Sequence, residues 1–230
     1  MSSSLSALFL AMLGFTGGHF LLSHPPVRSR IVSKLGEGAF LGGYSLLMAV
    51  FLVLAVYGYR SAAVVALWDL GPGARHVPLV VMPFALALAI IGLTSRNPTA
   101  VGGQLGADAG SSGKGIVTIT RHPFLWGAGL WALAHLAPNG DAASLVLFGG
   151  IAILAFGGMK AIDHKRALKS GSVWQAFAWS TSLVPFAAAI AGRTRVDWVG
   201  IGLLRPLVAL ALYVLLLFTH HRIFGGTPVL

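Results

Sequence analysis

The chain has 230 residues, of which 56% are hydrophobic and only 10% are charged, and it contains no cysteine. Soluble domains carry about 25% charged residues, so this balance excludes an ordinary soluble fold. The lack of thiols excludes disulfides, iron–sulfur clusters and zinc–cysteine sites. A formal net charge of +10 would suggest nucleic acid as the partner of a soluble protein. Basic loops that orient membrane helices explain the charge better here, and we expect no nucleic-acid partner.

Long apolar stretches separated by short loops predict an all-α, polytopic transmembrane bundle of six or seven helices, in a single domain covering residues 1–230. A helix needs about 20 apolar residues to cross a bilayer core about 30 Å thick. The predicted spans are, in chain order, residues 4–22, 39–59, 77–94, 124–137, 142–159, 175–190 and 201–219. The sixth is short and holds several hydroxyl side chains and a proline, which leaves open whether it crosses or forms an interfacial or re-entrant segment.

The distribution of basic residues predicts the orientation. The loops after the first, third and fifth predicted spans hold ten Lys and Arg residues, against two in the loops that alternate with them. The ten are Arg28, Arg30, Lys34, Arg96, Lys114, Arg121, Lys160, Lys165, Arg166 and Lys169, and the two are Arg60 and Arg75. Because basic residues concentrate in cytoplasmic loops, we expect the ten in the cytoplasm and the amino terminus outside.

Two histidines, His19 and His135, lie inside predicted spans. An ionisable group at membrane depth is costly and usually has a partner or a task. One interpretation is a hydrogen bond to a neighbouring helix. The other is ligation of a metal or haem, because neutral imidazole is a common ligand and two histidines on separate helices can clamp one iron. Gly17 and Gly18 would leave room for a flat macrocycle, but the predicted topology places His19 nearer the cytoplasm and His135 nearer the outside.

A second group of polar residues flanks the predicted spans on the cytoplasmic side. Arg121 and His122 directly precede a proline, which is tolerated at the start of a helix. They therefore lie at the N-terminal end of a helix, which we call the cytoplasmic mouth. This end either favours binding of an anion or is a plain capping site. Asp163 and His164 follow the fifth span, either as part of its basic flank or as a polar cluster that faces this mouth. His122 and His135 are thirteen residues apart, about 220° around a helix, so they face different neighbours.

Several segments together resemble the NnrU family of bacterial inner-membrane proteins. They are residues 115–123, 126–127, 134–136, 139–141, 163–166, 181–186, 192–193 and 220–225, with His19 and the turn at 36–38. The resemblance covers nearly the whole chain. The family is named for an association with nitrite and nitric oxide reduction. It is related to zeta-carotene isomerase, a membrane haem b protein that moves a double bond from cis to trans.

The resemblance implies haem b as cofactor, with His19 and His135 as axial ligands of its iron. It implies a redox or cis–trans isomerase role on an apolar substrate, or an accessory role in nitrite and nitric oxide metabolism, in the bacterial inner membrane. The expected partners are membrane lipid and an apolar or nitrogen-oxide-related small molecule. The chain departs from the isomerase at two points: Ala132 replaces a cysteine, and a further histidine has no counterpart around Arg60.

A more distant likeness connects the chain to membrane methyltransferases of the isoprenylcysteine and phospholipid type. It rests on the Arg-His-Pro sequence, a charged pair after the next helix and a later Val-Pro. This likeness implies S-adenosylmethionine bound at Arg121, His122 and Asp163, although the usual Glu-Glu pair reads Asp163-His164 here. A third hypothesis is a non-enzymatic membrane accessory protein whose histidines are structural.

Overall fold

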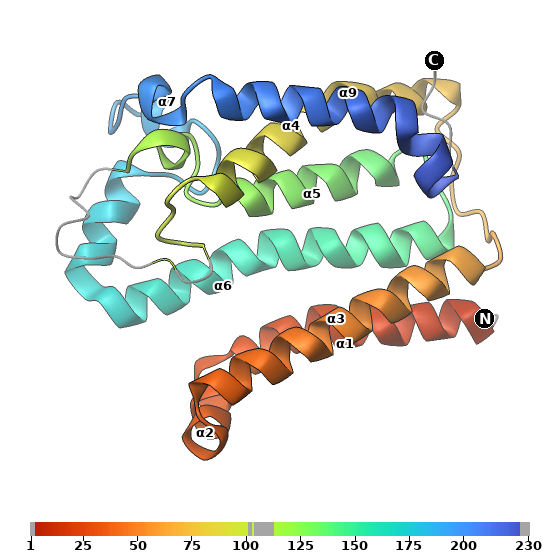
Figure 1. Cartoon of the computed structure of the whole chain (residues 1–230), viewed down its shortest axis with the longest axis horizontal. Helices are drawn as coiled ribbons and strands as arrows, with labels where there is room; N and C mark the ends of the chain where they lie inside the picture. The colour runs from red at the N-terminus through yellow and green to blue at the C-terminus, as the bar shows by residue number, and fades with distance from the viewer. Residues whose placement is uncertain (1–2, 101–102, 104–112, 226–230) are drawn as a thin grey trace. The chain divides into compact units, whose positions relative to one another are not determined.

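The computed structural model describes residues 3–100, 103 and 113–225, and this part of the chain is built from α-helices (Figure 1). The helices are α1 (Ser3–Ser23), α2 (Pro25–Leu35), α3 (Glu37–Ser61), α4 (His76–Thr94), α5 (Pro123–Leu136), α6 (Ala142–Ser180), α7 (Ala187–Ile190), α8 (Trp198–Ile201) and α9 (Leu204–Phe224). Two 3-10 turns, η1 (Pro72–Arg75) and η2 (Gly115–Thr118), precede α4 and α5. The chain forms two compact units. The first runs up to Ala74 and includes His135–Leu154; the second comprises Arg75–Ala134 and the chain from Ala155 onward.

Five of the described helices are long and apolar enough to cross a membrane, which confirms an all-α, multi-pass membrane protein. They are Ser3–Ser23, Glu37–Ser61, Pro72–Thr94, Ala142–Ser180 and Leu204–Phe224. The predicted count of six or seven spans stays a prediction beyond these five candidates among the described residues. The fourth predicted span is α5, whose 14 residues extend about 21 Å at 1.5 Å per residue, less than the thickness of the bilayer core.

The sixth predicted span, residues 175–190, is not one helix. Its first part belongs to α6, which continues to Ser180, and only Ala187–Ile190 is helical again. Pro185 cannot continue a helix because its ring blocks the backbone hydrogen bond. Phe186 then adopts a left-handed conformation with φ 63°, which stops any continuous helix at this point.

Two other differences concern helices that extend into predicted loops. The segment after α1 forms α2, which begins with two prolines at positions where a missing N–H costs nothing and ends at Gly36, with φ 80°. Helix α6 continues well past residue 159, because the charged residues that follow are good helix formers. Its backbone is non-helical only at Gly171, with φ 45° and ψ −119°.

In the first unit, α1 and α3 lie side by side and antiparallel (Figure 1). Glycine permits the close approach: a Cβ added at Gly58 of α3 would stand 3.0 Å from the Cα of Leu8. The Thr16 hydroxyl donates to the Gly150 carbonyl at 3.3 Å and so connects α1 to the first part of α6. Small residues at such positions are the usual means of tight helix packing in membranes.

In the second unit, α4 packs along α9, and the Tyr213 hydroxyl donates to the Leu79 carbonyl at 3.0 Å. Helix α5 also packs tightly on α4, because Gly127 has no Cβ to hold the backbone of α4 away. A buried apolar cluster fills the end of the unit near η2. Its members are Ile91, Ile116, Val117, Ile119, Trp174, Phe177 and Ile201.

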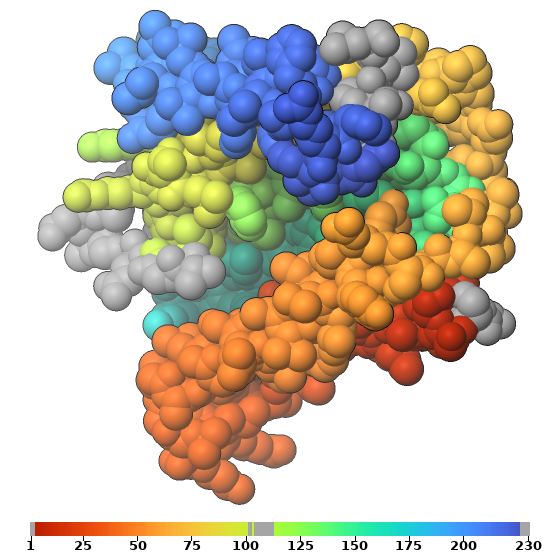
Figure 2. All heavy atoms as spheres, turned by 45° about the vertical axis from the view of Figure 1, so that its right-hand side comes forward, coloured from red at the N-terminus to blue at the C-terminus, as the bar shows by residue number. Residues whose placement is uncertain are grey.

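The outer surfaces of the long helices are apolar. Helix α3, drawn in orange, and helix α9, drawn in blue, form part of the surface visible in Figure 2, and both helices carry exposed large hydrophobic side chains. Examples on these helices are Leu46, Val50, Val53, Leu54, Leu207, Leu210, Leu215 and Phe218. Apolar patches of this extent are rare on soluble monomers but are what lipid-facing helices present to hydrocarbon.

Candidate functional site

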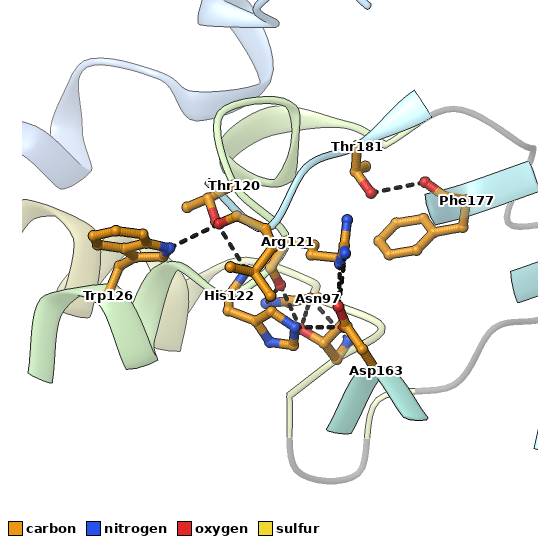
Figure 3. Close-up of polar contacts among 10 residues, drawn as sticks. Asn97, Thr120, Arg121, His122, Trp126, Asp163, Phe177 and Thr181 are labelled. Atoms are coloured by element: carbon orange, nitrogen blue, oxygen red, sulfur yellow. Dashed lines mark hydrogen bonds and ion pairs between the residues drawn. The ribbon is translucent and has the colours of Figure 1, made fainter. Parts of the chain in front are cut away.

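The structure brings together three of the four residues predicted at the cytoplasmic mouth (Figure 3). Arg121 donates from Nε and Nη2 to Oδ2 of Asp163, at 2.9 and 2.6 Å. The Nε2 atom of His122 lies 2.7 Å from the other oxygen, Oδ1. The exposed fractions of the three side chains are 14%, 16% and 1% for Arg121, Asp163 and His122. We call these three residues the Arg121–Asp163 network.

His164, the fourth residue, does not join the network. It follows Asp163 on α6, and one residue along a helix turns the side chain by about 100°. His164 is exposed, and no hydrogen bond joins it to the other described residues. The sequence pattern placed the acidic residue correctly but could not distinguish it from its neighbour.

Backbone hydrogen bonds hold the segment before α5 in place. The Arg121 carbonyl accepts from Asn97 Nδ2 at 3.3 Å and from the Thr99 hydroxyl. The Arg121 N–H donates to the Ser182 carbonyl at 3.0 Å. The Leu183 carbonyl accepts from the Thr120 hydroxyl and from Trp126 Nε1, both at 2.8 Å. The loop after α4, the start of α5 and the segment after α6 therefore meet at the network.

The electrostatics of the network are already balanced within the protein. Both oxygens of Asp163 accept hydrogen bonds, and the Arg121 guanidinium also lies over the Trp174 ring at 5.8 Å. The arrangement is therefore suited to clamping α6 against the start of α5, because each carboxylate oxygen already accepts a hydrogen bond within the protein.

Asp197 is a polar junction that the sequence analysis missed. Its Oδ2 accepts from the Gly115 N–H of η2 and its Oδ1 accepts from the Gly200 N–H of α8, each at 2.8 Å. Its own N–H donates to the Thr118 hydroxyl at 3.0 Å. The two backbone hydrogen bonds hold the pKa of the Asp197 carboxyl below its ordinary value. Its position before a short apolar turn is the N-cap signal that could have identified it.

His19 lies on α1 in a geometry that is typical of metal-ligating histidines. Its Nδ1 is 2.7 Å from the Phe15 carbonyl, and because a carbonyl only accepts, Nδ1 carries the proton. Nε2 then keeps its lone pair, and no described residue hydrogen-bonds to it. The half-buried ring is held edge-on by Phe15 at 4.6 Å and by Tyr44 of α3 at 5.6 Å. Ligating histidines usually donate their other ring N–H to a backbone carbonyl or carboxylate in this way.

The glycines beside His19 differ in what surrounds them. A Cβ at Gly18 would stand 2.8 Å from the terminal methyl carbon of Met48, so this position serves the contact with α3. A Cβ at Gly17 would meet nothing within 4 Å. Room for a ligand next to α1 is therefore found on the Gly17 side.

The His135 ring packs against a different set of aromatic rings from those around His19. The His135 ring stacks on Phe148 with centroids 5.5 Å apart, and Phe148 lies edge-on to Tyr59 at 6.0 Å. The Thr16 hydroxyl of α1 donates to the Gly150 carbonyl, so the helix that carries Phe148 lies against α1 about one turn before His19. The two imidazole rings have different neighbours, and ligation of one iron by His19 and His135 stays a prediction.

The helices define a class: an all-α, multi-pass membrane protein. Residues 7–228 match the NnrU protein family, and the chain belongs to this family. The resemblance inferred from the sequence is thereby confirmed.

Two curated relatives are chloroplastic 15-cis-zeta-carotene isomerases. The protein of Zea mays is 32% identical over 81 residues, and that of Arabidopsis thaliana is 38% identical over 80 residues. These segments cover 35% and 34% of this chain, and 22% of each isomerase. The similarity is therefore distant and partial. No solved structure matches the chain.

Proposed function

We propose that this protein is a haem-b-binding protein of the bacterial inner membrane, with its amino terminus outside. Its role would be redox or cis–trans isomerase chemistry on an apolar substrate, or support of nitrite and nitric oxide metabolism. The observation that carries the proposal is the geometry of His19, whose Nδ1–H is fixed on the Phe15 carbonyl while Nε2 stays free. The partial similarity to carotene isomerases supports the reaction class.

The residues around His19 would bind and orient the cofactor. The Phe15 carbonyl selects the tautomer that can ligate iron, and Tyr44 restrains rotation of the imidazole. When bound, haem would supply a redox-active iron whose properties depend on its axial ligands and surroundings. The apolar face of α1 would exclude water from that iron.

The second unit contains a small apolar groove. The groove lies between α4 and α5 and has a volume of about 210 Å³. Its lining carries no charged side chain and consists of Met82, Ala85, Leu86, Ala89, Phe124, Gly127, Ala128 and Trp131. Such a surface suits a hydrocarbon chain rather than a polar metabolite.

The proposed orientation follows from the basic residues of α2. This helix holds Arg28, Arg30 and Lys34, and it turns away from the axis of α1 and α3 in Figure 1. Since basic residues collect on the cytoplasmic side, α2 would lie at the cytoplasmic surface of the membrane. Alkaline phosphatase fused after α3 should then be active, whereas a fusion within α2 should be inactive. The reverse pattern would contradict the orientation.

The haem proposal is tested by the absorbance spectrum. The protein is purified in detergent from haem-replete cells, and the Soret band is compared with that of His19→Ala. The matched control is His164→Ala, which removes an exposed histidine outside the network. We expect the band in the wild type and the control and its loss in His19→Ala. A colourless wild type that also fails to take up added haem would refute the proposal.

No observation favours the methyltransferase alternative. Asp163 already accepts hydrogen bonds from Arg121 and His122, so a role in holding S-adenosylmethionine would compete with this network. Titration calorimetry with S-adenosylmethionine tests the point, and we expect no heat of binding. The accessory-protein hypothesis would gain support if His19→Ala lowered thermal stability while the wild type bound no haem.

A further inference from the structure

We propose that α2 is an interfacial helix that binds the headgroup of an anionic phospholipid through Arg30 and Lys34. Haem plays no part in this interaction, which involves only the first unit and the lipid around it. Three features support it: the place of α2 between two spans, the pairing of its other basic residue, Arg28, with Glu37, and the exposure of Arg30 and Lys34.

Helix α2 lies at one surface of the membrane because it connects the ends of two antiparallel spans. The 21 residues of α1 extend about 31 Å, close to the thickness of the bilayer core, so the chain leaves the hydrocarbon where α1 ends. Pro25 and Pro26 then start a helix that turns away from the axis of α1 and α3 (Figure 1). Helix α3 begins directly after Gly36 and crosses back. The 11 residues of α2 therefore lie at the level of the headgroups.

The side chains of α2 suit the boundary between headgroups and acyl chains. Val27 and Ile31 are half-buried, and Leu35 is 62% exposed. Arg30 and Lys34 are exposed, and their long aliphatic stems can lie along apolar surface while the charges reach the headgroups. Helices that carry apolar and basic side chains in this way lie in the plane of the interface and are attracted to anionic lipids.

The basic residues of α2 divide into one that is paired within the protein and two that are not. Helix α2 and the first turn of α3 hold three basic residues and one acidic residue, Glu37. Arg28 Nη2 donates to Glu37 Oε1, and the Arg28 guanidinium lies over the Phe40 ring, 5.2 Å from its centroid. Among the described residues, none forms an ion pair with Arg30 or Lys34. Two positive charges are therefore left for an external anion.

Arg30 and Lys34 are placed to hold one phosphate group between them. They are four residues apart, and at this spacing the Cβ atoms on a helix are about 5–6 Å apart on one face. The guanidinium offers paired N–H groups to phosphate oxygens, and the ammonium adds a mobile point charge. A lipid phosphate lies at the depth of α2, and its acyl chains can contact the exposed Leu35. The charge and the apolar contact together favour an anionic phospholipid over a soluble anion.

The test uses a dye at a single site on α2. The chain has no cysteine, so Ser33→Cys, at an exposed position beside Lys34, can be labelled selectively. The labelled full chain in mixed micelles is titrated with phosphatidylglycerol or phosphatidylcholine that carries a nitroxide near the headgroup, which quenches the dye on close approach. We expect phosphatidylglycerol to bind about 25-fold more tightly, since each basic residue near an anionic surface contributes about fivefold.

Two double variants on the same helix boundary separate the proposed site from the internal ion pair. Arg30→Gln with Lys34→Gln should abolish the preference for phosphatidylglycerol. Arg28→Gln with Glu37→Gln removes the internal pair without changing the net charge, and the preference should remain. Melting temperatures are recorded for all variants. Lys34→Gln alone, which should lose about fivefold, replaces the first double variant if that protein unfolds.

A control for general electrostatic attraction lies on α6. Lys160→Gln with Lys169→Gln also removes two exposed positive charges and should keep the preference. Equal binding of the two lipids to the labelled chain would overturn the proposal, as would an equal loss of preference in the α6 variant. Relief of the quenching by millimolar inorganic phosphate, to the same extent as by unlabelled phosphatidylglycerol, would also overturn it, because the site would then select free phosphate.

Discussion

The Arg121–Asp163 network should contribute much more to stability than an exposed pair of the same residue types. Asp163→Asn keeps the shape of the side chain but removes the charge from an oxygen that accepts two hydrogen bonds from Arg121. Hydrogen bonds to charged groups contribute about 1.5–3 kcal/mol each, and breaking a buried ion pair costs about 3–5 kcal/mol. Because Arg121 and Asp163 are 14% and 16% exposed, we expect a loss of about 2–4 kcal/mol.

The matched control is the pair of Arg28 and Glu37, whose side chains are 38% and 54% exposed. Glu37→Gln should cost about 0–1 kcal/mol, as surface pairs do. Both variants are unfolded in mixed detergent micelles and followed by tryptophan fluorescence, because Trp174 lies against Arg121. Combining Asp163→Asn with Arg121→Gln should give a coupling energy of about 0.5–3 kcal/mol. Equal losses for the two single carboxylate variants would refute the reasoning.

Further predictions concern a histidine, a glycine and a carboxylate. His122→Ala should lower the free energy of unfolding by about 2 kcal/mol, because the His122 side chain is buried. His164→Ala should change it by less than about 0.5 kcal/mol, because His164 is exposed. Equal effects of the two substitutions would contradict this reasoning. Gly127→Val should destabilise the protein by about 1–3 kcal/mol, because a Cβ at Gly127 would stand 2.6 Å from a backbone oxygen of α4. In the control variant Gly149→Ala, the atom nearest to the new Cβ is 3.7 Å away, so the melting temperature should stay unchanged. The stabilisation from Asp197, whose pKa is lowered in the folded state by backbone hydrogen bonds, should be complete at neutral pH and fade as the pH falls below about 4. Asp197→Asn should therefore lose less stability on acidification than the wild type, and an identical pH profile would argue against the role.

Hydrophobic pattern alone located most of the membrane helices. The predicted spans 4–22, 39–59, 77–94 and 201–219 correspond to α1, α3, α4 and α9, with ends that differ by a few residues. These four helices could be predicted because each contains about twenty successive apolar residues, and a segment of that length has few alternatives to a membrane-spanning helix. Shorter or mixed segments were not predictable: α2 is only 11 residues long, and residues 175–190 combine a helix end, a proline and a left-handed Phe186.

The candidate site was predictable where charges flank the spans. Arg121, His122 and Asp163 stood out because polar residues are rare in this chain, and the structure places them in contact. The angular position of a residue around α6 decides whether its side chain faces the network. The sequence does not give this angle, so it could not exclude His164 from the site. Ligation of one iron by His19 and His135 stays a prediction, and the hydrogen bond of His19 Nδ1 to the Phe15 carbonyl required coordinates.

The most direct test of the account is the haem stoichiometry of the purified protein, measured as the pyridine haemochrome after titration with haem. The account predicts saturation at one haem per chain for the wild type and for His164→Ala, and little specific uptake by His19→Ala. Equal uptake by the wild type and His19→Ala would contradict the central claim that the imidazole on α1 holds the iron.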